Sequence, residues 1–437
     1  MVKKLLYLWE EISASFWFVP IIILLLAITA AFGLIYLDSR VEIRPDGFAI
    51  YLFSGSEDSA RRILTTIAAA NIGIAGTVFS ITLVVLTLAS SQLGSRLLRN
   101  FMYDKINQVV LGTYVSTFVY CLLILNSIVH NDGNSFIPVI SVFVAILAAI
   151  AGIILLIIFI HHVSVTIQAN RVVSEISNSI LKNAEKLFPD EIGDEPDEPF
   201  PGQNFLKKSF KFIKEIKCSK NGYLQSVDGG GLINIARENE GIIILYYRPG
   251  NFMVKDLVIS EVLGNKECSD EIAGKINDSF IIGKLRTPLQ DVEFSIDQIA
   301  EIASRALSPG INDPYTAIAC IDNLTSVMCR LATRKFPHPN RYDREGRLRV
   351  IASSLTFGGM LNAAFNQIRH DAERNPSVIK KLMESMIVIN HFVKNGDRKK
   401  EILEHANMIM GSAERNFQEK RDLDYLKQKF NSLNSES

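Results

Sequence analysis

Two stretches of this sequence carry residue types and spacings that could support binding or transport. The first, ALSPGINDPYTA, spans residues 306–317 and places two prolines, a glycine and an Asn-Asp pair between two runs of helical periodicity. The second is a seven-residue repeat of small and hydroxyl side chains inside an apolar segment: Thr66, Ala70, Gly73, Thr77, Ser80, Val84, Thr87 and Ser91. What each pattern can do depends on the elements that position it.

Four long apolar segments lie within the first 160 residues, at 16–37, 63–89, 109–129 and 136–160. Each is long enough to cross a bilayer, which takes about 20 apolar residues. None contains Asp, Glu, Lys, Arg or His. The first segment is too long for the core of a cleaved signal peptide and no A-x-A-like site follows it. The sequence therefore predicts an integral membrane protein with four transmembrane helices.

Lys and Arg in the short flanking loops predict the orientation of these helices. Eight of them lie on the side of the two termini: Lys3, Lys4, Arg96, Arg99, Lys105, Arg171, Lys182 and Lys186. The opposite side has four, all in the first loop, and the HNDGN loop has none. We expect a bacterial inner membrane protein with both termini in the cytoplasm.

The rest of the chain is more polar and divides by composition. We predict a transmembrane domain at 1–161, a stalk helix with an acidic linker at 162–205, a small α/β domain at 206–290 and a helical domain at 291–437. The order of elements in the α/β domain is β-α-β-β-α-β, which is typical of a ferredoxin-like split unit. A small β-barrel around RPGNFMVKDLVISEVL is the competing arrangement.

The repeat in the second span has two interpretations. Small residues let helices approach closely, so the stripe Thr66, Gly73, Thr77, Ser80, Thr87, Ser91 favours a packed seam within a bundle or between subunits. Its hydroxyl groups are also compatible with a pore lining. In that case Arg96 and Arg99 would ring the inner mouth and favour anions. The spans lack the charged groups that pumps and ion-coupled carriers need, which favours passive conduction or none.

The 306–317 stretch is interpreted as a corner between two helices. Gly310 is predicted to end the first helix in a left-handed conformation. Asp313 is predicted to cap the second helix, with Pro314 at its first position. Together with Ser308 and Asn312, these residues form the candidate motif turn. A ligand-binding role for Asn312 and Asp313 is the alternative to this structural role.

The remaining polar motifs indicate no catalytic, cofactor or metal site. His161 and His162 point about 100° apart on a helix, so interfacial anchoring is preferred to metal binding. DGGG at 228–231 does not complete a GxGxxG motif and is interpreted as an Asp228 cap. The sequence around His370, His391 and His405 has no serine or cysteine nucleophile motif. We therefore disfavour an enzyme and predict no cofactor and no nucleic-acid partner.

Four segments of the chain resemble an uncharacterised bacterial family of predicted membrane proteins, a domain of unknown function. They are the stretch from GTVFSITLV to CLLIL in spans two and three, GYLQSVD, RPGNF and IASRALSPGINDPYTA, in that order. The resemblance covers nearly the whole chain. It implies an N-terminal membrane part and a soluble C-terminal part, and it carries no catalytic residue, substrate or cofactor.

Two functions remain open after this reasoning. The first is a channel-like homo-oligomer lined by the second span and regulated by its cytosolic part. The second is a membrane-anchored sensor or scaffold that does not conduct, with a small ligand or a protein as the partner of its cytosolic domain. The expected partners in both are the lipid bilayer and further copies of the chain.

Overall fold

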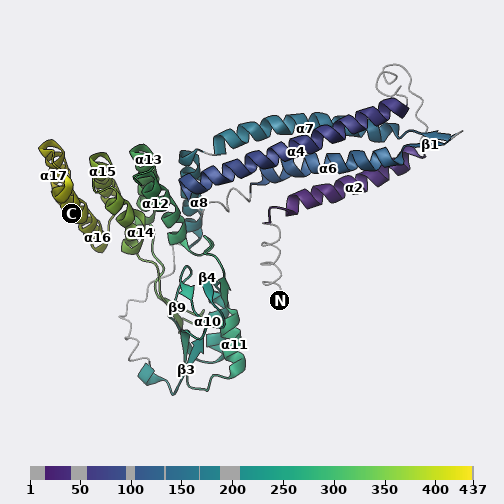
Figure 1. Ribbon diagram of the computed structural model, residues 1–437. Coiled ribbons are helices and arrows are strands. Elements are labelled where there is room, and N and C mark those ends of the chain that lie inside the picture. Colours follow the sequence, from purple (N-terminus) through teal and green to yellow (C-terminus); the bar gives the residue numbers. More distant parts are fainter. Residues whose placement is uncertain are drawn as a thin grey trace. The chain divides into compact units, whose positions relative to one another are not determined.

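The computed structural model describes residues 15–40, 57–94, 104–131, 134–166, 168–187 and 207–435 (Figure 1). The chain forms two compact units, Met1–Arg171 and Val172–Ser437. We refer to them as the membrane unit and the C-terminal unit, and each is considered by itself.

The membrane unit confirms the four predicted apolar helices. They are α2 (Phe18–Asp38), α4 (Glu57–Leu93), α6 (Lys105–Ser127) and α7 (Val139–Thr166), with a two-stranded hairpin, β1 (Val129–Asn131) and β2 (Asn134–Phe136), before α7. Helix α6 is the most buried and packs against the other three (Figure 1). Gly112 makes one of these contacts close, because a Cβ there would lie 2.9 Å from the Pro20 Cα.

Polar contacts fix the ends of these helices to one another. The Asp38 carboxylate, at the end of α2, accepts hydrogen bonds from the Ile140 and Ser141 N–H groups at 2.9 and 3.0 Å. It therefore satisfies N–H groups of the first turn of α7. At the other end of α7, His162 Nε2 contacts the carboxylate of Asp104, which caps α6. His162 thus connects the end of α7 to the start of α6, and interfacial anchoring by His161 and His162 stays a prediction.

The C-terminal unit contains two sheets and nine helices in its described residues. The strands are β3 (Phe212–Lys217), β4 (Gly222–Val227), β5 (Ile242–Leu245), β6 (Phe252–Met253), β7 (Val258–Gly264), β8 (Phe280–Gly283), β9 (Asn340–Tyr342) and β10 (Leu348–Ala352). The helices are α8 (Ala169–Leu187), which starts just before the unit, α10 (Gly229–Glu238), α11 (Asp270–Asp278), α12 (Val292–Ala306), α13 (Pro314–Ala332), α14 (Phe357–Asp371), α15 (Pro376–Phe392), α16 (Gly396–Asn416) and α17 (Lys420–Ser435).

The predicted α+β class is confirmed, and the strands are divided between two sheets. One has the order β3-β7-β5-β10-β9 and the other β6-β4-β8. The pairings β4–β8 and β5–β7 are those of a ferredoxin-like unit, but β3 lies beside β7 where that unit would place β4. Strand β10 pairs in parallel with β5, with Val350 opposite Ile243. The sheet thus draws strands from both sides of the predicted 290/291 boundary, and the four-part division stays a prediction.

Helices α12 to α17 form the rest of the C-terminal unit, and each packs against at least one other of the group (Figure 1). Their starts follow local sequence, because Asp291, Asp313, Thr356, Asn375 and Asn395 each accept a backbone N–H as the N-cap residue. The facing sides bury apolar residues such as Leu324, Phe365 and Leu382. This helical layer holds the two ends of the 306–317 turn in place.

Candidate functional site

The small-residue stripe of α4 lies on the outside of the membrane unit. All eight positions of the repeat, which include Thr66, Gly73, Thr77, Ser80, Thr87 and Ser91, are exposed. The opposite face of α4 is buried through residues such as Leu64, Ala75 and Val78. The stripe is therefore not a seam within the bundle of one chain. Arg96 and Arg99, predicted for the inner mouth, lie outside the described residues.

The outward faces of α2 and α7 differ in kind from this stripe. Bulky side chains cover most of their area, among which are Leu25, Leu26 and Phe32 on α2, and Ile153, Ile154 and Ile157 on α7. Such surfaces are suited to lipid chains. The exposed small residues of α2, Thr29, Ala30 and Gly33, form a shorter group than the stripe of α4. On α4, bulky residues such as Ile72 and Phe79 flank the stripe, while a Cβ added to Gly73 or Gly76 would have no neighbour within 4 Å. The stripe is a shallow, open strip along one helix.

The hydroxyl groups on the stripe are satisfied within the helix. Thr77, Ser80 and Thr87 each donate to the carbonyl oxygen four residues earlier, at 3.2, 2.9 and 2.9 Å. Each oxygen keeps lone pairs that can accept a further hydrogen bond. The stripe can therefore lie against another helix without leaving an unpaired donor, and it can also accept hydrogen bonds from water.

The 306–317 turn has the predicted cap and a different left-handed residue. Asp313 accepts hydrogen bonds from Tyr315 N–H and Thr316 N–H, both at 3.1 Å, and caps α13. The prediction that Gly310 adopts the left-handed conformation is wrong, because the residue with positive φ, +49°, is Asn312. Asn is among the few non-glycine residues that enter this region readily. Ser308 supports the turn by donating its hydroxyl to Arg305 O at 2.6 Å.

Stability measurements on substitutions in this turn test its structural role as a corner between two helices. Asp313→Ala should lower the free energy of unfolding by about 1 kcal/mol through loss of the cap. Hydrogen bonds from Thr316 hold the pKa of Asp313 below its usual value, so the difference in unfolding free energy from wild type should shrink as pH falls below about 4.

Asn312→Val should lower the free energy of unfolding by roughly 1–3 kcal/mol because of backbone strain, whereas Asn312→Gly should be tolerated. Urea-dependent proteolysis of the full-length variants measures these differences, and an equal cost for Val and Gly at 312 would contradict the strain.

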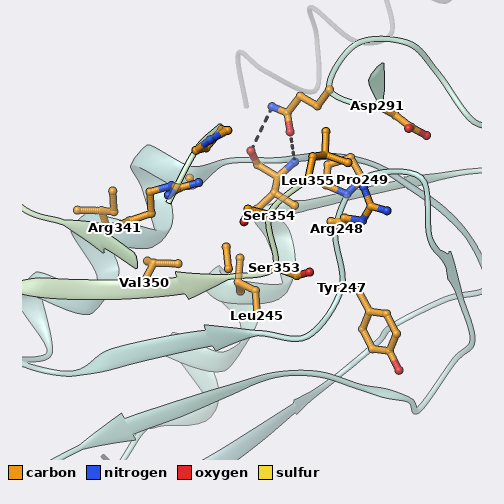
Figure 2. A pocket seen from close by; sticks show the side chains of 16 residues that line it. Leu245, Tyr247, Arg248, Pro249, Asp291, Arg341, Val350, Ser353, Ser354 and Leu355 are labelled. Atoms are coloured by element: carbon orange, nitrogen blue, oxygen red, sulfur yellow. Dashed lines mark hydrogen bonds between the residues drawn. The ribbon is translucent and has the colours of Figure 1, made fainter. Parts of the chain in front are cut away.

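A cavity of about 240 Å³ opens in the C-terminal unit where β5 and β10 end (Figure 2). Because these strands are parallel, their carboxyl ends meet at one edge of the sheet, and the segments Tyr247–Pro249 and Ser353–Leu355 leave it together. The start of α10 closes another side through Gly229. Gln290 completes the wall by pairing with the main-chain N–H and carbonyl oxygen of Val227 at 3.0 and 3.4 Å.

The charged residues of the cavity differ in how they are paired. Arg248 Nη2 lies 2.8 Å from a Glu293 carboxylate oxygen. Asp291 is held at 2.8 Å by Arg286. Arg341 has a hydrogen bond to the Asn340 carbonyl oxygen at 3.4 Å and no carboxylate partner among the residues that the structure describes. Burial lowers the pKa of its guanidinium from the ordinary value. Figure 2 shows Arg341 beside Val350, across the cavity from Arg248 and Asp291.

Two of the sequence segments that carry the family resemblance meet at this cavity. GYLQSVD supplies Val227 and Asp228. Asp228 caps α10, because its carboxylate accepts a hydrogen bond from Gly231 N–H at 3.2 Å. RPGNF supplies Arg248 and Pro249. Gly250 has φ +99°, and a Cβ there would collide with the Asp291 carboxylate. Glycine is therefore required at the point where the RPGNF loop meets the start of α12.

The sequence alone does not predict the cavity. The FPHPNRYDREG stretch lies within the helical domain predicted at 291–437, whereas it contains β9 and Arg341. The DGGG segment was identified, and its Asp228 cap is confirmed. Within the described ranges, no group of three or more His, Cys, Asp or Glu residues is placed to hold a metal ion. His370, His391 and His405 lie on three different helices, α14, α15 and α16.

Four apolar helices followed by a mixed α/β and helical unit define this chain as a membrane protein with a large C-terminal part outside the spans. It belongs to the family described as Predicted membrane protein (DUF2254), whose model matches residues 13–387. Similar proteins include Uncharacterized protein Mb1321c of Mycobacterium bovis and Uncharacterized protein Rv1290c of Mycobacterium tuberculosis. Each is 29% identical over 379 residues, which are 85% of this chain and 71% of the relative. No solved structure matches the chain.

Proposed function

We propose that the protein is a channel-like homo-oligomer in which the exposed stripe of α4 forms the contact between subunits around a common axis. The carrying observation is the outward position of Gly73, Thr77 and Ser80, in a stripe that runs along α4 on a bundle whose other outer faces are mostly bulky. Small residues gain little from lipid contact, but they let helices of neighbouring subunits approach closely. Hydroxyl oxygens at the same positions can line a wet path.

A second candidate is a membrane-anchored sensor that does not conduct. The cavity at the ends of β5 and β10 favours it, because a concave site with an apolar lining and a few polar groups is typical of ligand binding. In either function the C-terminal unit is the part that would detect a cytosolic signal. Both candidates place the termini of the chain in the cytoplasm of a bacterial cell.

A cysteine at Ser80 tests the channel directly. In a Cys121→Ser background, Ser80→Cys should cross-link between subunits on oxidation and react with a small water-soluble thiol reagent, with a change in current across a reconstituted bilayer. Ile153→Cys on α7 is the matched control, since Ile153 is also exposed but is surrounded by bulky residues. Labelling of the Cys121→Ser parent gives the background from the other cysteines. An unreactive thiol at position 80 and no current under any salt or tension condition would leave the sensor as the better account.

The orientation is tested separately by labelling in intact cells. The HNDGN loop carries no Lys or Arg, so Asp132→Cys should react from outside with a membrane-impermeant reagent. Ser437→Cys should react after the membrane is permeabilised. Both positions lie outside the described residues, and the test depends on sequence alone. The reverse labelling pattern would invert the orientation.

A further inference from the structure

We propose that the cavity beside Arg341 binds a small organic carboxylate with an apolar body, such as an aromatic or branched aliphatic acid. The inference is independent of the proposed channel, because it rests on the C-terminal unit alone. It starts from the position of the cavity at the carboxyl ends of two neighbouring parallel strands, β5 and β10. Open α/β sheets bind ligands outside the carboxyl ends of their strands.

The lining of the cavity sets the apolar part of the ligand. Val227, Ile233, Leu245, Val350 and Leu355 contribute aliphatic side chains. The volume of about 240 Å³ lies between the roughly 150 Å³ of an apolar cavity that holds benzene and the roughly 300 Å³ where drug-sized sites begin. A single ring or a short branched chain fits this space.

The charge of the ligand follows from Arg341. Arg341 is half-buried and has no carboxylate partner in the described part of the chain, so it has lost part of its hydration without an ion pair there in return. Arg248 pairs with Glu293 through Nη2, while its buried Nη1 has no hydrogen-bond partner among the described residues, and Asp291 pairs with Arg286. The uncompensated positive charge of the cavity is therefore at Arg341. Arginine binds a carboxylate through two parallel N–H bonds, which would also fix the orientation of the ligand.

The first turn of α10 contributes space to the cavity and little net positive charge. Gly229 lines the cavity, and a Cβ added to it would have no neighbour within 4 Å. The first N–H groups of a helix carry partial positive charge, but the Asp228 carboxylate accepts from Gly231 N–H at 3.2 Å and offsets that charge here. Ser353 and Ser354, which follow β10, add hydroxyl groups to the lining. A single arginine suits a singly charged carboxylate better than a doubly charged phosphate ester.

Titration of the full-length protein in nanodiscs tests this proposal. The probes are benzoate, phenylacetate and isovalerate, with benzamide as the neutral counterpart of benzoate, and phenyl phosphate and inorganic phosphate as anions of a different class. Calorimetry or ligand-observed NMR should give saturable binding of at least one carboxylate, with a dissociation constant between about 10 μM and about 1 mM for so small a ligand. Benzamide should bind at least about tenfold more weakly, a difference that one charged hydrogen-bonded contact can supply.

Two pairs of variants connect binding to the cavity. Arg341→Gln should weaken carboxylate binding at least about tenfold, while Arg344→Gln removes a positive charge from an exposed position next to β9 and should leave binding unchanged. Gly229→Leu should fill the cavity and abolish binding. Its control is Gly396→Leu, because Gly396 is also the first residue of a helix with open space around its Cα.

The outcomes divide clearly. Carboxylate binding that is lost in Arg341→Gln and Gly229→Leu, but kept in the two controls, supports the proposal. Melting temperatures of all four variants show whether each is folded, and Arg341→Lys is the fallback if Arg341→Gln is not. Absence of saturable binding for every carboxylate, equal binding of benzamide and benzoate, or preference for either phosphate would overturn it. None of these results bears on the current measured for Ser80→Cys.

Discussion

Replacing Arg286 with methionine should lower the free energy of unfolding of the C-terminal unit by about 3–5 kcal/mol. Arg286 binds two carboxylates, Asp291 at 2.8 Å and Asp297 at 2.9 Å. The Asp291 side chain is 2% exposed and also caps α12 through the Phe294 N–H at 3.0 Å. Methionine would keep much of the packing volume but leave this carboxylate buried without a cation. The cost of an uncompensated buried charge exceeds the loss of an ordinary hydrogen bond.

Urea-dependent proteolysis of the full-length protein in detergent measures this cost, and Arg305→Met is its control. Arg305 forms a more exposed i,i+4 pair with Glu301 at 3.2 Å, so its loss should cost no more than about 0.5 kcal/mol. Similar losses of unfolding free energy in Arg286→Met and Arg305→Met would show that burial of the ion pair does not determine the cost. Asp291 also lines the cavity, so Arg286→Met should in addition weaken any ligand bound there.

The pH dependence of Arg286→Met gives a second check. Burial raises the pKa of Asp297 above its usual value, with Arg286 opposing the shift. A carboxyl group with a raised pKa in the folded state binds more protons folded than unfolded, so folding gains stability as pH falls toward that pKa. Removing Arg286 takes away the opposing interaction. The deficit of Arg286→Met should therefore be largest near neutral pH and smaller in mild acid.

The parts of the fold that the sequence predicts are those set by local chemistry. Four uncharged apolar segments predict four helices because a bilayer requires the backbone to bond within each segment. The caps Asp228 and Asp313 are predicted because a side chain two or three residues before a free N–H determines them. The order of strands and helices between 222 and 283 follows from changes of hydrophobic period.

The parts of the fold that the sequence does not predict depend on contacts with residues that are distant along the chain. Strand β9 has three residues, too few to show a hydrophobic period. It joins the sheet by pairing with β10, which in turn pairs with β5, about 100 residues earlier in the chain. Arg341 therefore looks like a loop residue until the sheet places it opposite Val350. The left-handed residue of the 306–317 turn is a similar case. Glycine and asparagine both allow positive φ, and the hydrogen bond from Asp313 N–H to Ala306 O, at 2.7 Å, belongs to a turn with Asn312 in that conformation.

The stripe of α4 shows the same limit within the membrane. A repeat of seven residues identifies one face of a helix, but the contacts that bury a face are properties of the whole bundle. Structure places Leu64, Ala68 and Ala75 inward and the stripe outward. The proposed function places a second copy of the chain on this stripe, and a substitution at Gly76 tests that placement.

If the proposed homo-oligomer forms through α4, replacing Gly76 with leucine should dissociate it while leaving each subunit folded. A side chain added at Gly76 meets nothing within 4 Å in the single chain, so the subunit itself can accept it. Between two closely packed helices the same side chain would force the backbones apart, and close contact is the main source of affinity between helices in lipid. Leucine is also favourable in an apolar helix facing lipid. We expect a change from oligomer to monomer.

Light scattering or single-molecule photobleaching in lipid nanodiscs measures the number of subunits. Ala151→Leu on α7 is the matched control, because Ala151 is exposed on a face covered with isoleucines that is assigned to lipid. This variant should keep the wild-type subunit number. Gly76→Ala, which adds one methyl group, should have an intermediate effect that grows on dilution into more lipid. If Gly76→Leu assembles like the wild type and Ala151→Leu does not, the subunit contact lies on α7 and a pore lined by α4 is excluded.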